Sequence, residues 1–229
     1  LVGSEMCIRD RYNTNHNKVL SIGNAVPFAI GGFSSRTVQT VVAEGQPVGF
    51  IRGYKAVLNS DNSLKEILPL QNLGSTLPTG YGNFSLSASY KNLSLMINGD
   101  YQYGAYVHSF DRQFRFSKGL KDGAIPEKAL EGLDQGANWL NFTNFFVEKS
   151  DFVKIRNIGI SYDYKPEKYL KNINFGFNVY NPFAFTASSV DPEAALAGAR
   201  SQGAVAVGGL NYSSYSTPRQ YVGSIRISF

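Results

Sequence analysis

Cysteine, charge and long apolar runs are all scarce in this sequence. Cys7 is the single cysteine, so the chain can form neither an internal disulfide nor a cysteine-based zinc cluster. No run of about 18 consecutive apolar residues exists, so any membrane contact must be made by strands and not by a spanning helix. Charged residues make up 17% of the chain and the net charge is only +5. The basic residues are scattered, which excludes a basic tail for nucleic acid.

Motifs for catalysis and for cofactors are absent as well. The sequence contains no G-x-S-x-G, no Walker loop and no G-x-G-x-x-G, and His16 and His108 stand in no metal-binding spacing. We therefore expect a protein that is not an enzyme, with no catalytic residues, no metal and no cofactor. Both histidines are interpreted as structural.

Tyrosine, phenylalanine and glycine are abundant instead, with 14, 16 and 23 residues. This composition is typical of strands and turns. The first eleven residues stand apart, because we find no alternation and no turn chemistry in them. Residues 1–11 resemble translated sequencing-adapter read-through, so we predict that this segment is not native and that residues 12–229 are the incomplete, C-terminal part of a longer chain.

The last ten residues alternate with a period of two. Apolar and aromatic side chains fall on one face of this strand, and mainly polar ones on the other. A half-apolar strand that ends in an aromatic residue resembles the assembly signal of bacterial outer-membrane barrels. That signal comprises Tyr221, Ile225, Ile227 and Phe229.

Four more stretches alternate in the same way: 83–91, 93–103, 152–164 and 173–179. Strands of about ten residues have the length that crosses a membrane at a tilt. Only the start of 152–164 is irregular, because Val153 and Ile155 fall out of phase. The predicted lipid-facing residues are Phe84, Leu86, Leu95, Ile97, Ile160, Phe175, Phe177, Ile225 and Ile227.

The remaining elements are less regular. We predict strands at 19–23, 37–43 and 48–58, and a loop at 24–36. Ser63 and Glu66 have capping-box spacing, which predicts a helical turn at 64–68. A further helix is predicted at 127–133.

Connection lengths favour an antiparallel transmembrane β-barrel, of which this all-β chain supplies about 6–8 strands. Connections 91–92 and 165–172 are short, whereas 59–82, 104–151 and 182–218 are long. Short periplasmic turns that alternate with long extracellular loops are typical of such barrels. Two alternatives remain open: a secreted β-sandwich that binds carbohydrate, and a complete small barrel of about eight strands.

Several local sequence motifs resemble the SusC/RagA-type TonB-linked outer-membrane receptors. Residues 44–54 resemble the family's EGxPxGxxxGY segment, and residues 147–162 its V-x-x-A-S-Y-x-R-L-K-N-L stretch followed by S-Y. Asn181 with Asp191-Pro192-Glu193 is similar to the N-L…D-P-E loop, although Asn181 precedes a proline here. Pro218-Arg219 matches the P-x-R ending loosely.

The resemblance implies the C-terminal portion of a TonB-dependent receptor β-barrel of about 22 strands that encloses an N-terminal plug. Such receptors import glycans or peptides across the bacterial outer membrane in Bacteroidetes. The implied partners are a SusD-like surface lipoprotein, the TonB complex through the missing N-terminal part, the barrel assembly machinery and outer-membrane lipid. Nucleic acid is not among them.

Two groups of loop residues are candidates for ligand or partner contacts. Asp191 and Glu193 could hold a cation or fix a loop, or form only a solvated turn, because two carboxylates alone do not complete a calcium shell. The aromatic candidates suit sugar stacking or partner contacts, or the packing of loops on one another. They are Trp139, Phe142, Tyr212 and Tyr215.

Overall fold

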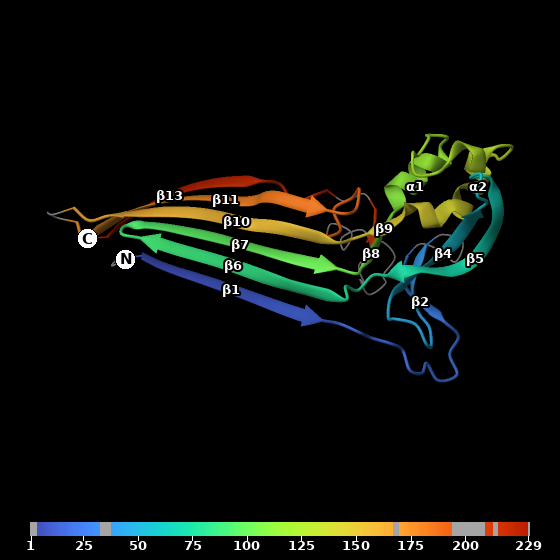
Figure 1. Cartoon of the computed structure of the whole chain (residues 1–229), viewed down its shortest axis with the longest axis horizontal. Coiled ribbons are helices and arrows are strands. Elements are labelled where there is room, and N and C mark those ends of the chain that lie inside the picture. Colours follow the sequence, from blue (N-terminus) through green and yellow to red (C-terminus); the bar gives the residue numbers. More distant parts are fainter. Residues whose placement is uncertain (1–3, 33–37, 167–169, 194–208, 213–214, 229) are drawn as a thin grey trace.

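The structure, a computed structural model, describes residues 4–32, 38–166, 170–193, 209–212 and 215–228. It is an all-β chain of mainly antiparallel strands, arranged as one long sheet with a compact head at one end (Figure 1). The head contains two smaller sheets and all the described helices. Within the described residues, no helix is long and apolar enough to span a membrane.

The long sheet has six strands, and every neighbouring pair is antiparallel. In spatial order they are β1 (Ser4–Thr14), β6 (Gly80–Tyr90), β7 (Leu93–Tyr103), β10 (Phe152–Tyr164), β11 (Asn172–Thr186) and β13 (Gln220–Ser228). The predicted strands at 83–91, 93–103 and 152–164 are confirmed. The predicted strand at 173–179 is longer than expected, because β11 continues to Thr186.

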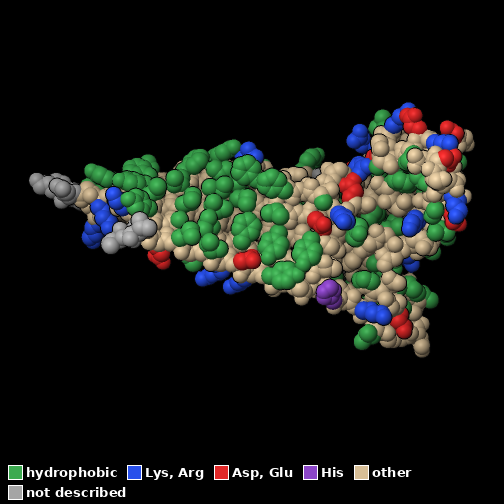
Figure 2. Space-filling view, in the orientation of Figure 1, with side chains coloured by type: hydrophobic (Ala, Val, Ile, Leu, Met, Phe, Trp, Pro, Cys, Tyr) green, Lys and Arg blue, Asp and Glu red, His purple; other side chains and the backbone are tan. Residues whose placement is uncertain are grey.

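One face of this sheet is apolar and open. The register aligns Leu86, Ile97 and Ile158 across three strands. Side chains on this face remain accessible, with 44% exposure at Ile160 and 68% at Ile225. Figure 2 shows the apolar side chains gathered over the long strands. All nine residues predicted to share one apolar face do share it.

The opposite face is polar. It carries the serine, asparagine and glycine residues that alternate with the apolar ones, including Ser87, Ser161 and Asn178. These side chains line a hollow of about 530 Å³. No second sheet packs on the long sheet within the described part of the chain. The long sheet is therefore a single layer with two chemically different surfaces.

A β-bulge explains the irregular start of β10. The register shifts between Ile155 and Asn157 on both neighbouring strands, so Arg156 is the extra residue. A bulge inserts one residue and changes the phase of the alternation. Val153 and Ile155 therefore lie on the apolar face with Ile158, whereas Lys154 lies on the polar face, opposite Asp100.

All three long connections leave the sheet at the head end, and both short turns lie at the other end (Figure 1). This sorting of connection lengths was predicted. The first long connection is larger than predicted, because it runs from residue 15 to residue 79 and contains a sheet of its own. That four-stranded sheet consists of β2 (Phe28–Gly32), β3 (Gln39–Val42), β4 (Phe50–Leu58) and β5 (Leu64–Ser75).

Four local predictions in the head are wrong. The helical turn at 64–68 is part of β5, which pairs with β4, and Ser63 Oγ bonds to Asp61 in place of a helix cap. Residues 19–23 form no strand, and β2 lies inside the predicted loop at 24–36. The helix predicted at 127–133 is a single 3-10 turn, η1 (Glu127–Leu130). Strand pairing between distant segments overrides these local signals.

The segment expected to be foreign takes part in the sheet. Ser4–Thr14 forms β1, which pairs with β6 along its whole length and leaves every side chain exposed or nearly so. The sequence analysis found no alternation in this segment, and that interpretation was wrong. Met6, Ile8 and Tyr12 share the apolar face, although Asp10 also falls there. Whether residues 1–11 are native stays a prediction.

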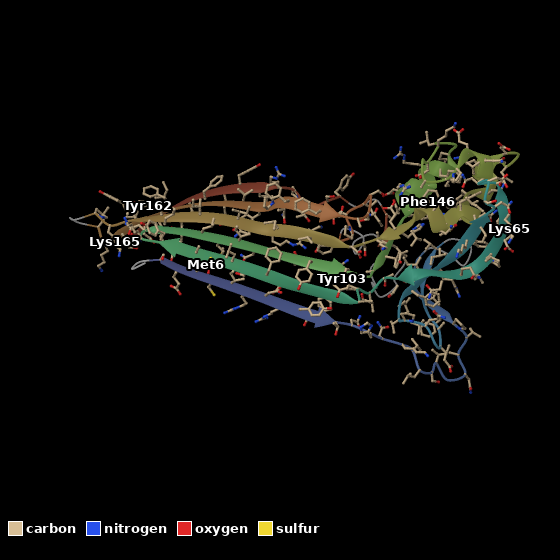
Figure 3. All side chains as sticks on the ribbon, in the orientation of Figure 1. Met6, Lys65, Tyr103, Phe146, Tyr162 and Lys165 are labelled. Carbon is tan, nitrogen blue, oxygen red and sulfur yellow. The ribbon has the colours of Figure 1, made fainter. Side chains whose placement is uncertain are left out.

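The buried core lies in the head. Besides the four-stranded sheet, the head has a small sheet of β12 (Leu210–Asn211), β8 (Tyr106–Ser109) and β9 (Val147–Lys149). Its helices are α1 (Phe110–Ser117), α2 (Gln135–Asn138) and η2 (Trp139–Phe146). Phe116, Phe142 and Phe146 form the centre of the larger hydrophobic cluster and are fully buried. Figure 3 shows Phe146 inside the head, far from Met6 and Tyr162 on the sheet.

Candidate functional site

Two of the four aromatic candidates are core residues. Phe142 is 0% exposed and contacts Phe116 edge to face, with ring centroids 5.9 Å apart. Trp139 is partly buried and packs edge-on against Phe110 at 6.1 Å. Both rings therefore pack within the head, and the Phe142 ring is not accessible to a ligand.

The other two aromatic candidates lie at the surface. Tyr212 packs its edge on Phe110 at 5.2 Å and is 38% exposed. Phe114 is 46% exposed and stacks on the same ring at 6.1 Å, so two exposed rings, Phe114 and Tyr212, pack against the buried Phe110. Tyr215 is 92% exposed. Tyr212 and Tyr215 thus keep the accessibility that a contact role requires.

A buried polar chain holds α1 against η2. Gln113 contacts His108 Nε2 through its Oε1 at 2.6 Å, and its Nε2 donates to Thr143 Oγ1 at 2.9 Å. All three side chains are fully buried. Burial lowers the pKa of His108 from its usual value of 6.5 to about 4, and nearby Arg112 acts in the same direction. His108 is therefore neutral at physiological pH.

This histidine makes the head sensitive to acid. The folded-state pKa of about 4 lies below the unfolded value of 6.5, so the unfolded chain binds the extra proton between these values. The stabilisation is intact above pH 6.5 and is lost as the pH falls towards 4. Between about pH 7.5 and pH 5 we expect a loss of about 2 kcal/mol in unfolding free energy. Urea titrations of the wild type and of His108→Gln should show this loss in the wild type only.

The acidic candidates form part of an ionic cluster on the polar face. Asp191 Oδ1 and Glu193 Oε2 both accept hydrogen bonds from Lys154 Nζ, at 2.6 and 2.7 Å. Lys154 is only 5% exposed. Arg156 bonds Glu193 on one side and Asp100 on the other, with Nε 2.5 Å and Nη2 2.8 Å from the Asp100 oxygens. The cluster thus joins the loop acids to β7 and β10.

The loop that carries these acids is anchored a second time in the head. We call residues Ser188–Glu193 the strap. The amide nitrogen and hydroxyl of Ser189 both donate to the Glu148 carboxylate of β9, at 2.5 and 2.9 Å. Glu148 in turn pairs with Arg112 of α1, which also makes a bidentate bond to Asp122. The strap therefore bridges the head and the long sheet.

The base of the same connection is also tied together. Asn181 Nδ2 donates to the Pro218 carbonyl at 3.1 Å, and Arg219 Nη2 donates to the Pro182 carbonyl at 2.5 Å. Residues from motifs that are far apart in the sequence thus meet in space. Lys154 and Arg156 come from one motif, and Asp191 and Glu193 from another.

Both acidic candidates, Asp191 and Glu193, face cations of the long sheet. Their role in ligand or partner contacts stays a prediction. Burial alone raises the pKa of Glu193, but hydrogen bonds from Arg156 and Lys154 outweigh it and lower this pKa. No group of three metal-ligating side chains occurs among the described residues. The sequence analysis did not identify Lys154, Arg156 and Asp100 as site residues. Their position among apolar residues of the strands was the only signal that could have pointed to them.

Three of the four residues of the predicted assembly signal lie on β13, an edge strand of the long sheet. Tyr221, Ile225 and Ile227 of β13 share the apolar face and pair with Val179, Phe175 and Ile173. Phe229 lies outside the described residues. The fold is thus an open, two-faced antiparallel sheet whose long connections are gathered at one end.

Solved structures with the same fold include three of one importer. They are the RagAB peptide importer in its open-open state and in its closed-closed state, and the RagAB peptide transporter. Each has a TM-score of 0.68 and an identity of 17 or 18% over the whole of this chain. The chain spans only 27 to 28% of the length of the chains it matches. No family model and no curated protein matched the sequence.

Proposed function

We propose that this chain is the C-terminal part of a SusC/RagA-type TonB-dependent receptor that imports glycans or peptides across the outer membrane of Bacteroidetes. In this role the long sheet is barrel wall and the head is formed by external loops. The receptor is not an enzyme. The observation that carries the proposal is the exposed apolar face of a single-layer sheet whose other face is polar.

Physical chemistry supports a membrane for this sheet. Apolar patches larger than a few hundred Å² are rare on soluble monomers. A sheet in lipid must turn apolar side chains outward and can keep polar ones towards a water-filled lumen. A secreted β-sandwich would instead bury its apolar faces between two layers, and the described residues contain no such second layer.

The partners that we propose are those of the receptor family that the sequence resembles. A SusD-like lipoprotein would meet the head, where Tyr212 and Tyr215 are exposed and suited to ligand or partner contacts. Outer-membrane lipid would cover the apolar face. The barrel assembly machinery would recognise β13 together with Phe229. The TonB complex would act through a plug outside this sequence. The structural neighbour RagAB is a peptide importer, which supports the import of peptides as a function of this fold.

Gene deletion tests the import function. We expect that a strain lacking the complete gene loses uptake of one class of oligosaccharide or peptide while its uptake of small sugars is unchanged. Fractionation should place the protein with the outer membrane, extracted only by detergent. A protein recovered from the aqueous fraction in a folded state would contradict the proposal.

A matched pair of substitutions tests which face meets lipid. Ile97 lies on the apolar face and Asn98 on the polar one, side by side on β7. A lysine at the bilayer midplane costs about 2–4 kcal/mol, so Ile97→Lys should lower the free energy of unfolding in lipid by that amount. Asn98→Lys should change it by under about 0.5 kcal/mol. Urea titrations in phospholipid vesicles measure both, and equal effects would count against the assignment.

A further inference from the structure

Two cations of the polar face, Lys154 and Arg156, lie together next to the head. The rest of this face is mostly serine, asparagine and glycine along the described parts of β6, β7, β10, β11 and β13. Its other strand cations lie on the two edge strands: Arg9 and Arg11 on β1, opposite Ser85 and Asn83, and Arg226 on β13, opposite Asn174. Among the described wall residues, the Asp100 carboxylate bonds to Arg156 of the pair. Within this group of three wall side chains, one positive charge is left over.

The strap adds two negative charges from outside the wall, those of Asp191 and Glu193, so the five-residue cluster has three carboxylates for two cations. Asp191 Oδ1 accepts from the Glu193 amide at 3.1 Å as well as from Lys154, so the short turn directs both carboxylates to the same two cations. A buried cation is costly unless it is paired. With the strap withdrawn, Lys154 and Arg156 would therefore favour another anion in the same position.

Space for another occupant exists beside this contact. A cavity of about 230 Å³ is lined by Lys154, Arg156, Thr186, Ser188 and Asp191, among others. Its lining combines cations with hydroxyl groups, which is the chemistry that binds carboxylates. The cavity lies where the strap meets β10 and β11, so a ligand that entered it would compete directly with the strap.

We propose that Lys154 and Arg156 form a binding site for solutes that carry carboxylates, and that Asp191 and Glu193 occupy it as an internal ligand. An acidic solute displaces the two strap carboxylates, bonds to the same cations and releases the strap from the wall. Apparent affinity is then reduced by the fraction of sites that the strap fills. The inference deepens the proposed import function and rests on it for its biological meaning.

Binding measurements on the complete, detergent-solubilised receptor test this site without any transport. The probes are acetyl-Asp-Pro-Glu-amide, its neutral counterpart acetyl-Asn-Pro-Gln-amide, and digalacturonate, which distinguishes acidic peptides from acidic glycans. The proteins are the wild type, D191N/E193Q, and the same variant with K154Q/R156Q added. Asp163→Asn is the control, because Asp163 lies at the other end of β10 and accepts hydrogen bonds from Asn172 and Asn174.

We expect D191N/E193Q to bind at least one acidic probe about tenfold or more tightly than the wild type and the control do. Adding K154Q/R156Q should abolish this binding, and the neutral probe should not bind to any variant. In the wild type, the acidic probe should speed hydrogen exchange of the strap amides and leave β7 and β10 unchanged, which requires no variant to fold.

The proposal is overturned if D191N/E193Q gains no affinity for either acidic probe, or if binding survives K154Q/R156Q. It is also overturned if strap exchange in the wild type is the same with and without the probe. A failed extraction or uptake test would instead refute the import function, and leave the result of the binding test standing.

Discussion

Lys154→Met should destabilise the contact between the strap and the long sheet by about 3–5 kcal/mol, the usual cost of removing one partner of a buried ion pair. Lys154 is 5% exposed and serves Asp191 and Glu193 together. Its loss leaves the Asp191 carboxylate, 11% exposed, and the Glu193 carboxylate, 34% exposed, with Arg156 as the nearby cation, and Arg156 already binds Asp100.

Hydrogen exchange of the strap amides and urea unfolding measure this effect. Lys91→Met is a suitable control, because Lys91 is exposed at the β6–β7 turn. Combining Lys154→Met with D191N/E193Q should recover most of the loss, since the buried charges then disappear together. A single variant that behaves like the control would show that the cluster does not hold the strap.

Phe142→Ala should be equally severe in the head. The ring is fully buried between Phe116 and Phe145, and truncation of a buried phenylalanine costs about 3–5 kcal/mol through lost burial and the cavity left behind. Tyr215→Ala, at an exposed aromatic residue of the connection between β11 and β13, should change the unfolding free energy by under about 0.5 kcal/mol.

Unfolding of the head, followed by the fluorescence of Trp139, reports this difference. Trp139 is the single tryptophan of the chain and packs against both hydrophobic clusters of the head. If Phe142→Ala were as stable as the wild type, the Phe142 ring would not be part of the core. A role in ligand or partner contacts would then be the better interpretation of this residue.

The long strands could be predicted because their signal is local. In β7 and β10 each residue type alternates with its neighbour, and the same alternation defines both faces of the folded sheet. The bulge at Arg156 shifted this phase, and only pairing with β7 and β11 shows where the extra residue lies. β5 was missed for a similar reason, because its strand form depends on pairing with β4 and not on its own capping signal.

The candidate site was predicted in part. Asp191 and Glu193 were identified as acids in a loop, but their cations are 37 to 39 residues away in sequence and sit in a strand. Phe142 was identified as a loop aromatic, yet its neighbour Phe116 comes from a different helix. Neither contact leaves a local pattern, since both arise from how the connections fold over one another.

Accessibility of positions 97 and 98 tests the central claim most directly. In a Cys7→Ser background, the variants Ile97→Cys and Asn98→Cys each carry one fluorescent label in the chain inserted into phospholipid vesicles. Brominated lipid should quench the label at position 97, and aqueous iodide should quench the label at position 98. Quenching by iodide at both positions, or protection of position 97 from brominated lipid, would contradict a sheet that turns its apolar face to the membrane.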